Sequence, residues 1–74
     1  MKPILKAVFF CESKSPNSSN PDCGVVTLRV AHSEKNEQFF QPNPEGLVSL
    51  QVLKAEAYEQ FEPGQEYQLV IQVV

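Results

Sequence analysis

The sequence predicts a mainly β fold: a small, barrel-like antiparallel sheet of about five strands, with one short α-helix before the last strand. Three observations predict it. Apolar residues alternate with other residues in several short segments, and loops rich in Pro, Asn, Ser and Gly separate these segments. At 74 residues the chain forms a single domain, 1–74, with a thin core, and curling into a barrel removes exposed sheet edges.

The first expected strand covers residues 3–12, because its apolar side chains alternate. A loop is expected at 13–22, where Ser, Pro and Asn favour turns. Gly24 then opens a second strand, which continues to Ser33. The inward-facing side chains of the two strands are Leu5, Ala7, Phe9, Cys11, Val26, Leu28 and Val30.

The register of these two strands bears on the cysteines. If Phe9 lies opposite Val26, the apolar sets share one face, Cys11 lies opposite Gly24 and Cys23 points to the other face. A disulfide between the cysteines would need a slip of one residue, which would turn one apolar set outward. We therefore expect two free thiols, one of them buried. A single His and the lack of a Cys-x-x-Cys pair exclude a structural zinc site.

The middle of the chain is expected to contain a turn, a short strand and a longer strand. Residues 33–38 form the polar turn, and Phe39-Phe40 form the short strand, with one ring in the core. Two prolines make the segment 41–46 a loop. Residues 47–53 form the longer strand, whose inward-facing side chains are Val48, Leu50 and Val52.

The end of the chain is expected to hold the helix and the closing strand. Residues 54–60 are rich in helix formers, and Pro63-Gly64 ends the helix. This helix is expected to cover one end of the barrel. The closing strand covers residues 67–73, and its inward-facing side chains are Tyr67, Leu69, Ile71 and Val73.

Charge is unevenly distributed along the chain. The net charge is −3, with +2 over residues 1–33 and −5 over residues 34–74. This balance disfavours nucleic-acid binding, which depends on Lys and Arg. The acidic part is either a solvated surface or a face that docks on a basic partner. No segment approaches the ~20 apolar residues of a membrane span. Lys6 interrupts the first apolar run, so we expect a cytoplasmic protein.

Catalysis is not expected. His32 is the only histidine, and its neighbours Ser33 and Glu34 do not form a base, nucleophile and orienting acid if the segment is extended. Glu62 and Glu66 resemble a carboxylate pair, but no second cluster of acids or bases accompanies them. We therefore predict a non-enzymatic protein without a metal or cofactor.

The last third of the chain carries the most distinctive motif. An Ala-rich segment is followed by Phe-x-Pro-Gly-Gln-Glu-Tyr at residues 61–67. Earlier short motifs accompany it: Phe9-x-Cys11, Val26-Thr27-Leu28, Asn36-Glu37 before Phe39, and Pro44-x-Gly46. The whole resembles a group of small uncharacterised proteins encoded by tailed bacteriophages and prophages. The chain departs from that group in its longer loop at 13–22 and its Val73-Val74 ending. The resemblance implies a viral gene context and a compact β-rich fold in the host bacterium, and no particular activity.

Two functions are considered. The first is a protein-binding accessory module that docks on a host or viral protein through exposed apolar residues ringed by acids. Its candidate contacts are Phe10, Phe40, Val74, Glu34, Glu37 and Glu62. Edge strands of such a module can also pair between copies, so we expect a monomer or a homodimer.

The alternative is a weak single-stranded nucleic-acid binder of the oligonucleotide-binding type, in which bases stack on aromatic rings along a basic groove. Lys6, Arg29 and Lys35 would supply the charge. The candidate rings are Phe10, Phe40 and Tyr58. The acidic net charge argues against high affinity for nucleic acid.

Overall fold

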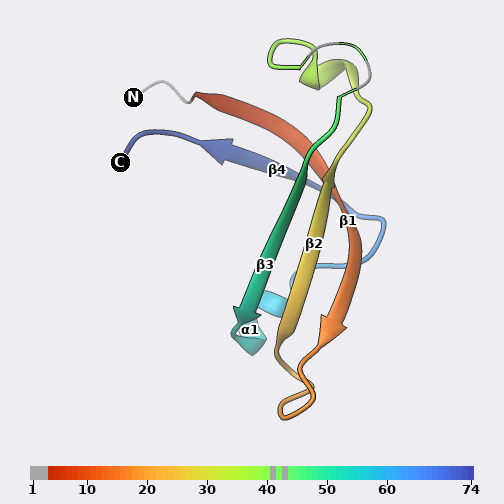
Figure 1. The fold of residues 1–74 in the computed structure, drawn as a ribbon, viewed down its shortest axis with the longest axis vertical. Helices are drawn as coiled ribbons and strands as arrows, with labels where there is room; N and C mark the ends of the chain where they lie inside the picture. The colour runs from red at the N-terminus through yellow and green to blue at the C-terminus, as the bar shows by residue number, and fades with distance from the viewer. Residues whose placement is uncertain (1–3, 41, 43) are drawn as a thin grey trace.

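A long first strand pairs with two other strands and organises the fold. The computed structural model describes residues 4–40, 42 and 44–74. β1 (Leu5–Pro16) pairs antiparallel with two strands in succession. Its first half pairs with β4 (Glu66–Ile71), and its second half pairs with β2 (Gly24–Val30). The strand bends between the two halves (Figure 1). β1 therefore joins the two ends of the chain into one sheet.

β3 (Leu47–Leu53) extends the sheet on the other side of β2, giving four strands in the order β3-β2-β1-β4. A 3₁₀-helix, η1 (Glu34–Asn36), follows β2, and a single-turn helix, α1 (Ala55–Tyr58), follows β3. The predicted mainly β fold with a short helix before the last strand is confirmed. The predicted barrel of about five strands is wrong, because β3 and β4 lie at opposite edges of an open sheet.

A helical turn replaces the strand expected at Phe39-Phe40. Ser33 Oγ accepts the Lys35 N–H at 3.2 Å and caps η1. The N–H groups of Phe39 and Phe40 both donate to the Asn36 carbonyl at 3.0 Å, so they are used within the turn. The prediction of a short strand here is wrong, because local capping outweighs the β propensity of two phenylalanines.

The register of β1 and β2 differs from the prediction by more than one residue. Phe9 lies opposite Val30, not opposite Val26. A bulge at Glu12 then shifts the ladder by one residue and changes which side chains face inward beyond it. Up to the bulge, the two apolar sets still face the same side of the sheet, so the facing of the strands was predicted although their pairing was not.

The loop between β1 and β2 is shorter than the predicted loop at 13–22. β1 continues to Pro16, and only residues 17–23 form the connection. The Asn17 N–H donates to the Cys23 carbonyl at 2.8 Å and closes this connection. Pro16 ends the strand because proline has no N–H for a further ladder bond.

The core lies on one face of the sheet. Its buried residues are Ala7, Phe9, Cys11, Val26, Leu28, Val30 and Tyr58. The partly buried residues that were predicted to face it, and do pack against it, are Leu5, Val48, Leu50, Tyr67 and Leu69. Ile71 and Val73 are 48% and 60% exposed, so their predicted burial is wrong: the end of β4 lies beyond the elements that cover the core. The side chain of Val52 lies outside what the structure describes.

α1 is shorter than the helix predicted at 54–60, because only Ala55–Tyr58 form an α-helical turn. It packs against β2, at the end of the sheet where β2 begins and β3 ends (Figure 1). The Tyr58 ring is buried there, and Lys14 Nζ lies 4.1 Å from its centroid. The helix therefore covers one end of an open sheet.

Candidate functional site

One buried side chain holds η1 against β1. Asn36 is 1% exposed, and its carboxamide is fully paired with backbone groups. Asn36 Oδ1 accepts the Val8 N–H at 2.7 Å, and Nδ2 donates to the carbonyls of Val8 and Ala31 at 2.9 and 2.8 Å. These bonds occupy the edge of β1 just beyond the last residue of β2. They therefore determine where η1 and the residues after it lie.

A groove of about 570 Å³ lies beside η1. Phe40 is half-buried and packs against the core, whereas Glu34 and Glu37 are exposed. The residues that line this η1 groove are His32, Ser33, Glu34, Asn36, Glu37, Phe40, Pro42 and Pro44. It combines apolar surface from a ring and two prolines with two carboxylates. No Lys or Arg is among the described residues that line it.

A second groove of about 550 Å³ adjoins the η1 groove, because His32 and Pro44 line both. Leu47 is 55% exposed and Glu45 is also exposed, so apolar surface again lies beside a carboxylate. The residues that line this second groove are Arg29, Val30, His32, Pro44, Glu45, Gly46 and Leu47. The two grooves together form a strip of apolar side chains and three glutamates, with Arg29 at the second groove.

His32 lies between β2 and η1 and is exposed. Among the described residues, no hydrogen bond joins it to Ser33 or Glu34, and Ser33 Oγ is used to cap η1. No group of three or more His, Cys, Asp or Glu side chains in that part of the chain could hold a metal ion. What the strip offers a ligand is charge and apolar contact.

The structure brings some of the predicted protein-binding residues together and separates the others. Glu34, Glu37 and Phe40 line one groove. Phe10 is half-buried on the outer face of β1, and Val74 is fully exposed beyond the end of β4. Glu62 is exposed in the turn after α1, where its N–H donates to Tyr67 Oη at 2.8 Å. These last three residues do not line the η1 groove.

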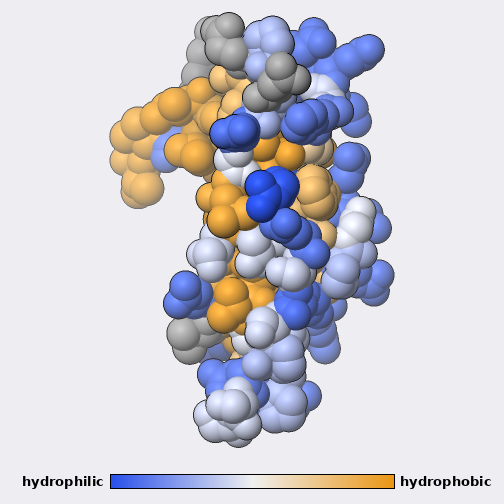
Figure 2. Space-filling view, turned by 45° about the vertical axis from the view of Figure 1, so that its right-hand side comes forward, coloured by the Kyte–Doolittle hydropathy of each residue, from blue (hydrophilic) through white to orange (hydrophobic). Residues whose placement is uncertain are grey.

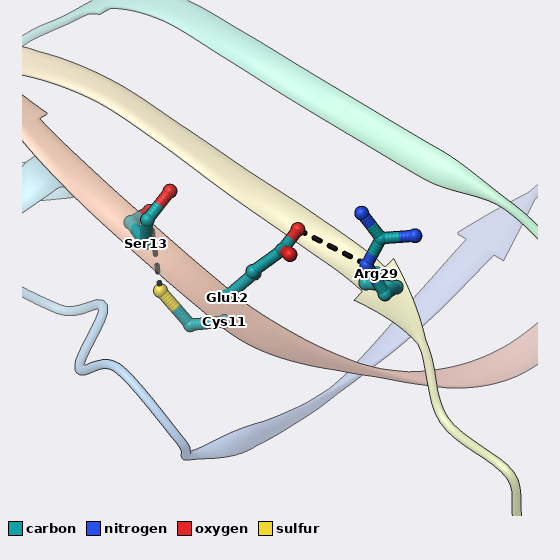
Figure 3. Close-up of polar contacts among 4 residues, drawn as sticks. All are labelled: Cys11, Glu12, Ser13 and Arg29. Atoms are coloured by element: carbon teal, nitrogen blue, oxygen red, sulfur yellow. Dashed lines mark hydrogen bonds and ion pairs between the residues drawn. The ribbon is translucent and has the colours of Figure 1, made fainter.

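The predicted basic residues lie on three different elements, β1, β2 and η1. Lys6 and Arg29 share the outer face of the sheet with Phe10, which lies opposite Arg29 in β2 and opposite Glu66 in β4. Arg29 Nε forms an ion pair with Glu12 Oε2 at 3.1 Å (Figure 3). Lys35 lies apart from them, on η1. Of the two basic side chains on the outer face, Arg29 is therefore paired with a carboxylate, and Lys6 lies opposite Val70.

Both cysteines are free, as predicted. Cys11 is 1% exposed, and its Sγ donates to the Ser13 carbonyl at 3.7 Å across the bulge (Figure 3). Burial raises the pKa of the Cys11 thiol above its ordinary value, and Lys14 and the bond to Ser13 offset only part of this effect. Cys11 is thus an enclosed thiol whose burial favours the protonated form.

Asn36 is the residue of this site that the sequence-based prediction missed. The spacing Ser33-x-x-Asn36 is compatible with a capped turn, but nothing local shows that the amide will be buried. Its burial depends on the end of β2 at Val30, which leaves the Val8 N–H without a strand partner. The burial of Asn36 therefore follows from the strand topology, which cannot be predicted from the periodicity of apolar residues.

Comparison of the chain with protein-family models, with curated proteins and with solved structures finds no significant match. Within the residues that the structure describes, no helix has the length and apolar character needed to cross a membrane. The geometry of the grooves is therefore the basis for a functional assignment.

Proposed function

We propose that this chain is a non-enzymatic protein-binding module, and that the η1 groove receives a basic, partly apolar segment of its partner. The observation that supports the proposal is the grouping of Phe40, Glu34 and Glu37 around one groove. The resemblance to phage and prophage proteins suggests a viral accessory role in the cytoplasm of a host bacterium, with a host or viral protein as partner.

A lysine or arginine side chain has the chemistry that this groove would recognise. Its apolar stem packs against the Phe40 ring, while its charged head lies near the carboxylates of Glu34 and Glu37. Exposed ion pairs contribute only about 0–1 kcal/mol each, so the affinity is expected to be modest, with a Kd of about 1 μM to 1 mM. Because these charges are exposed, salt should weaken the complex.

Fluorescence anisotropy with a labelled peptide of alternating Lys and Leu tests the proposal. The double variant Glu34→Gln/Glu37→Gln should weaken binding by about threefold to thirtyfold, because it removes both carboxylates of the groove. The matched control is Glu56→Gln/Glu59→Gln on and beside α1, which changes the net charge equally. Equal weakening by both variants, or no binding of the peptide to the native chain, would overturn the proposal.

The nucleic-acid alternative is supported by one observation, the common face of Lys6, Phe10 and Arg29. Against it, Arg29 is already paired with Glu12. A labelled oligothymidine at low salt separates the two proposals, because phosphate contacts are strongest there. Binding that Phe10→Ala abolishes and that the Glu34→Gln/Glu37→Gln variant leaves unchanged would favour the alternative. Undetectable binding of the oligonucleotide would exclude it.

A further inference from the structure

The end of the sheet formed by β4 is exposed and almost uncharged. Residues 67–74 contain no Asp, Glu, Lys or Arg. The large apolar side chains exposed on and beside this end are Ile4, Val70, Ile71, Val73 and Val74, between 46% and 118% exposed. Figure 2 shows apolar surface projecting as an arm from one end of the molecule. An uncharged, apolar edge strand is a template for pairing with another strand.

Within the part of the chain that the structure describes, β4 is an edge strand that pairs only with β1. Val8 directs its N–H and carbonyl toward Asn36 and Ala31, on the β2 side of β1. In an antiparallel ladder neighbouring residues alternate in direction, so Ala7 directs its groups toward its partner Leu69 in β4. The backbone N–H and carbonyl of Leu69 therefore point toward β1. The N–H and carbonyl groups of its neighbours Gln68 and Val70 point away from β1, to the outer edge of the sheet.

We infer that β4 pairs antiparallel with β4 of a second copy of this chain, about a twofold axis at Leu69. This register places Val70 opposite Gln68 of the partner subunit, so that both outward-facing backbones exchange hydrogen bonds. It places Ile71 opposite Tyr67 of the partner subunit on the core face. The apolar core face, which ends at β4 in one copy, then continues onto the core face of the other copy. The eight strands of the two copies form one sheet.

The distribution of charge favours a second copy of this chain as the partner of β4, and it favours antiparallel pairing. A twofold interface must be complementary to itself, and the uncharged run after Glu66 meets that condition. The antiparallel register places Glu66 opposite the neutral Gln72 of the partner subunit, whereas a parallel register would place two Glu66 carboxylates side by side. A basic partner would gain nothing from this edge. In the strand order β3-β2-β1-β4, pairing at β4 leaves the strip beside β2 and β3 open.

The test is a pair of substitutions at Val70, examined by sedimentation equilibrium. A two-strand junction buries less than the about 1,600 Å² of a standard interface, so the Kd should be about 1 μM to 1 mM. The apparent mass of the native chain should then rise from 8.3 kDa toward twice that value as concentration increases across this range. Val70→Pro removes an outward N–H, keeps the ladder to β1 and should raise the dimer Kd about 100-fold. The control Val70→Thr keeps the N–H and should still dimerise.

Two outcomes would overturn the inference: a native chain that stays monomeric at about 1 mM, or a folded Val70→Pro variant that dimerises like the native chain. Circular dichroism shows whether the proline variant folds. If it does not, Val70→Lys replaces it, because this substitution adds a charge to the edge without altering the backbone. A folded Val70→Lys variant that dimerises as the native chain does would equally overturn the inference. Binding of the basic peptide is measured separately, so failure of this inference leaves the groove proposal standing.

Discussion

The carboxamide of Asn36 pairs with the backbone of Val8 as a neighbouring strand would, accepting its N–H at 2.7 Å and donating to its carbonyl at 2.9 Å. β2 ends at Val30, and the Ala31 N–H adds one further bond to the Val8 carbonyl. A single side chain thus continues the sheet where a strand stops. The position of the η1 groove depends on it, because Asn36 itself lines that groove.

Replacing this side chain should destabilise the fold. Asn36→Ala leaves the part-buried Val8 N–H without its partner, so we expect the free energy of unfolding to fall by about 1–3 kcal/mol. Urea titration followed by circular dichroism measures the loss. The control is Asn20→Ala, because Asn20 Oδ1 accepts only an exposed Asp22 N–H at 3.2 Å, and its loss should cost less than about 0.5 kcal/mol. Equal losses in the two variants would contradict the bridging role of Asn36.

The strands could be predicted from periodicity, but their pairing could not. Phe9 faces the core because apolar residues alternate along β1, and this is a property of the sequence. Its partner is Val30 and not Val26, because β1 continues past the bulge at Glu12 to Pro16 and only residues 17–23 connect it to β2. The residues of β1 beyond the bulge are polar, so its effect on facing leaves no mark on the apolar alternation. The prediction of a barrel was wrong for a related reason, because it also depended on strand pairing. A barrel requires β3 to pair with β4, and these strands lie at opposite edges of the sheet.

The sequence named only some of the residues that line the η1 groove and missed Asn36, and it could not predict which of them lie together. Glu34, Glu37 and Phe40 were expected in one patch, and they line one groove because η1 turns the chain back toward β1. Phe10 and Val74 were expected in the same patch, yet one lies on the outer face of β1 and the other beyond β4. Exposure and charge can be read from the sequence, whereas proximity depends on the topology.

Gly24 is required where β2 begins. A Cβ at this position would overlap the Ser15 carbonyl oxygen and would lie 2.9 Å from both Pro16 Cα and Tyr58 Cε1. Gly24→Ala must therefore separate β1 from β2 or displace α1, and we expect a loss of about 2–3 kcal/mol in urea unfolding. The control Gly46→Ala meets its nearest atoms at 3.7 Å, an ordinary contact, and should change stability by less than about 0.5 kcal/mol. A tolerated Gly24→Ala would show that this close approach is absent in solution.

The hydroxyl of Tyr67 joins β4 to the turn after α1. It accepts the Glu62 N–H at 2.8 Å and donates to the Gln60 carbonyl at 3.0 Å, and its ring lies 5.0 Å from that of Phe61. Tyr67→Phe keeps the ring contact and removes both hydrogen bonds, so we expect a loss of about 0.5–1.5 kcal/mol. Thermal unfolding should show a lower Tm. Tyr58→Phe, which keeps its buried ring beside α1, is the matched control, and a larger loss there would contradict the role of the Tyr67 hydroxyl.

The buried thiol of Cys11 should make stability depend on alkaline pH. Burial raises its pKa in the folded state, with Lys14 and Ser13 opposing in part. Below the thiol pKa of the unfolded chain, about 8.5, both states keep the proton and this group has no effect. As pH rises above that value, only the unfolded state releases the proton, so the free energy of unfolding falls until the folded thiol also titrates.

Urea unfolding under reducing conditions between about pH 7 and pH 10 measures this fall, whose slope for one group is at most about 1.4 kcal/mol per pH unit. Cys11→Ala should lower stability at pH 7 by leaving a small cavity, but it should flatten the decline above about pH 8.5. Cys23→Ala leaves the buried thiol in place and should keep the decline of the native chain. Parallel curves for the native chain and Cys11→Ala would show that the thiol is accessible to water in solution, in conflict with its 1% exposure.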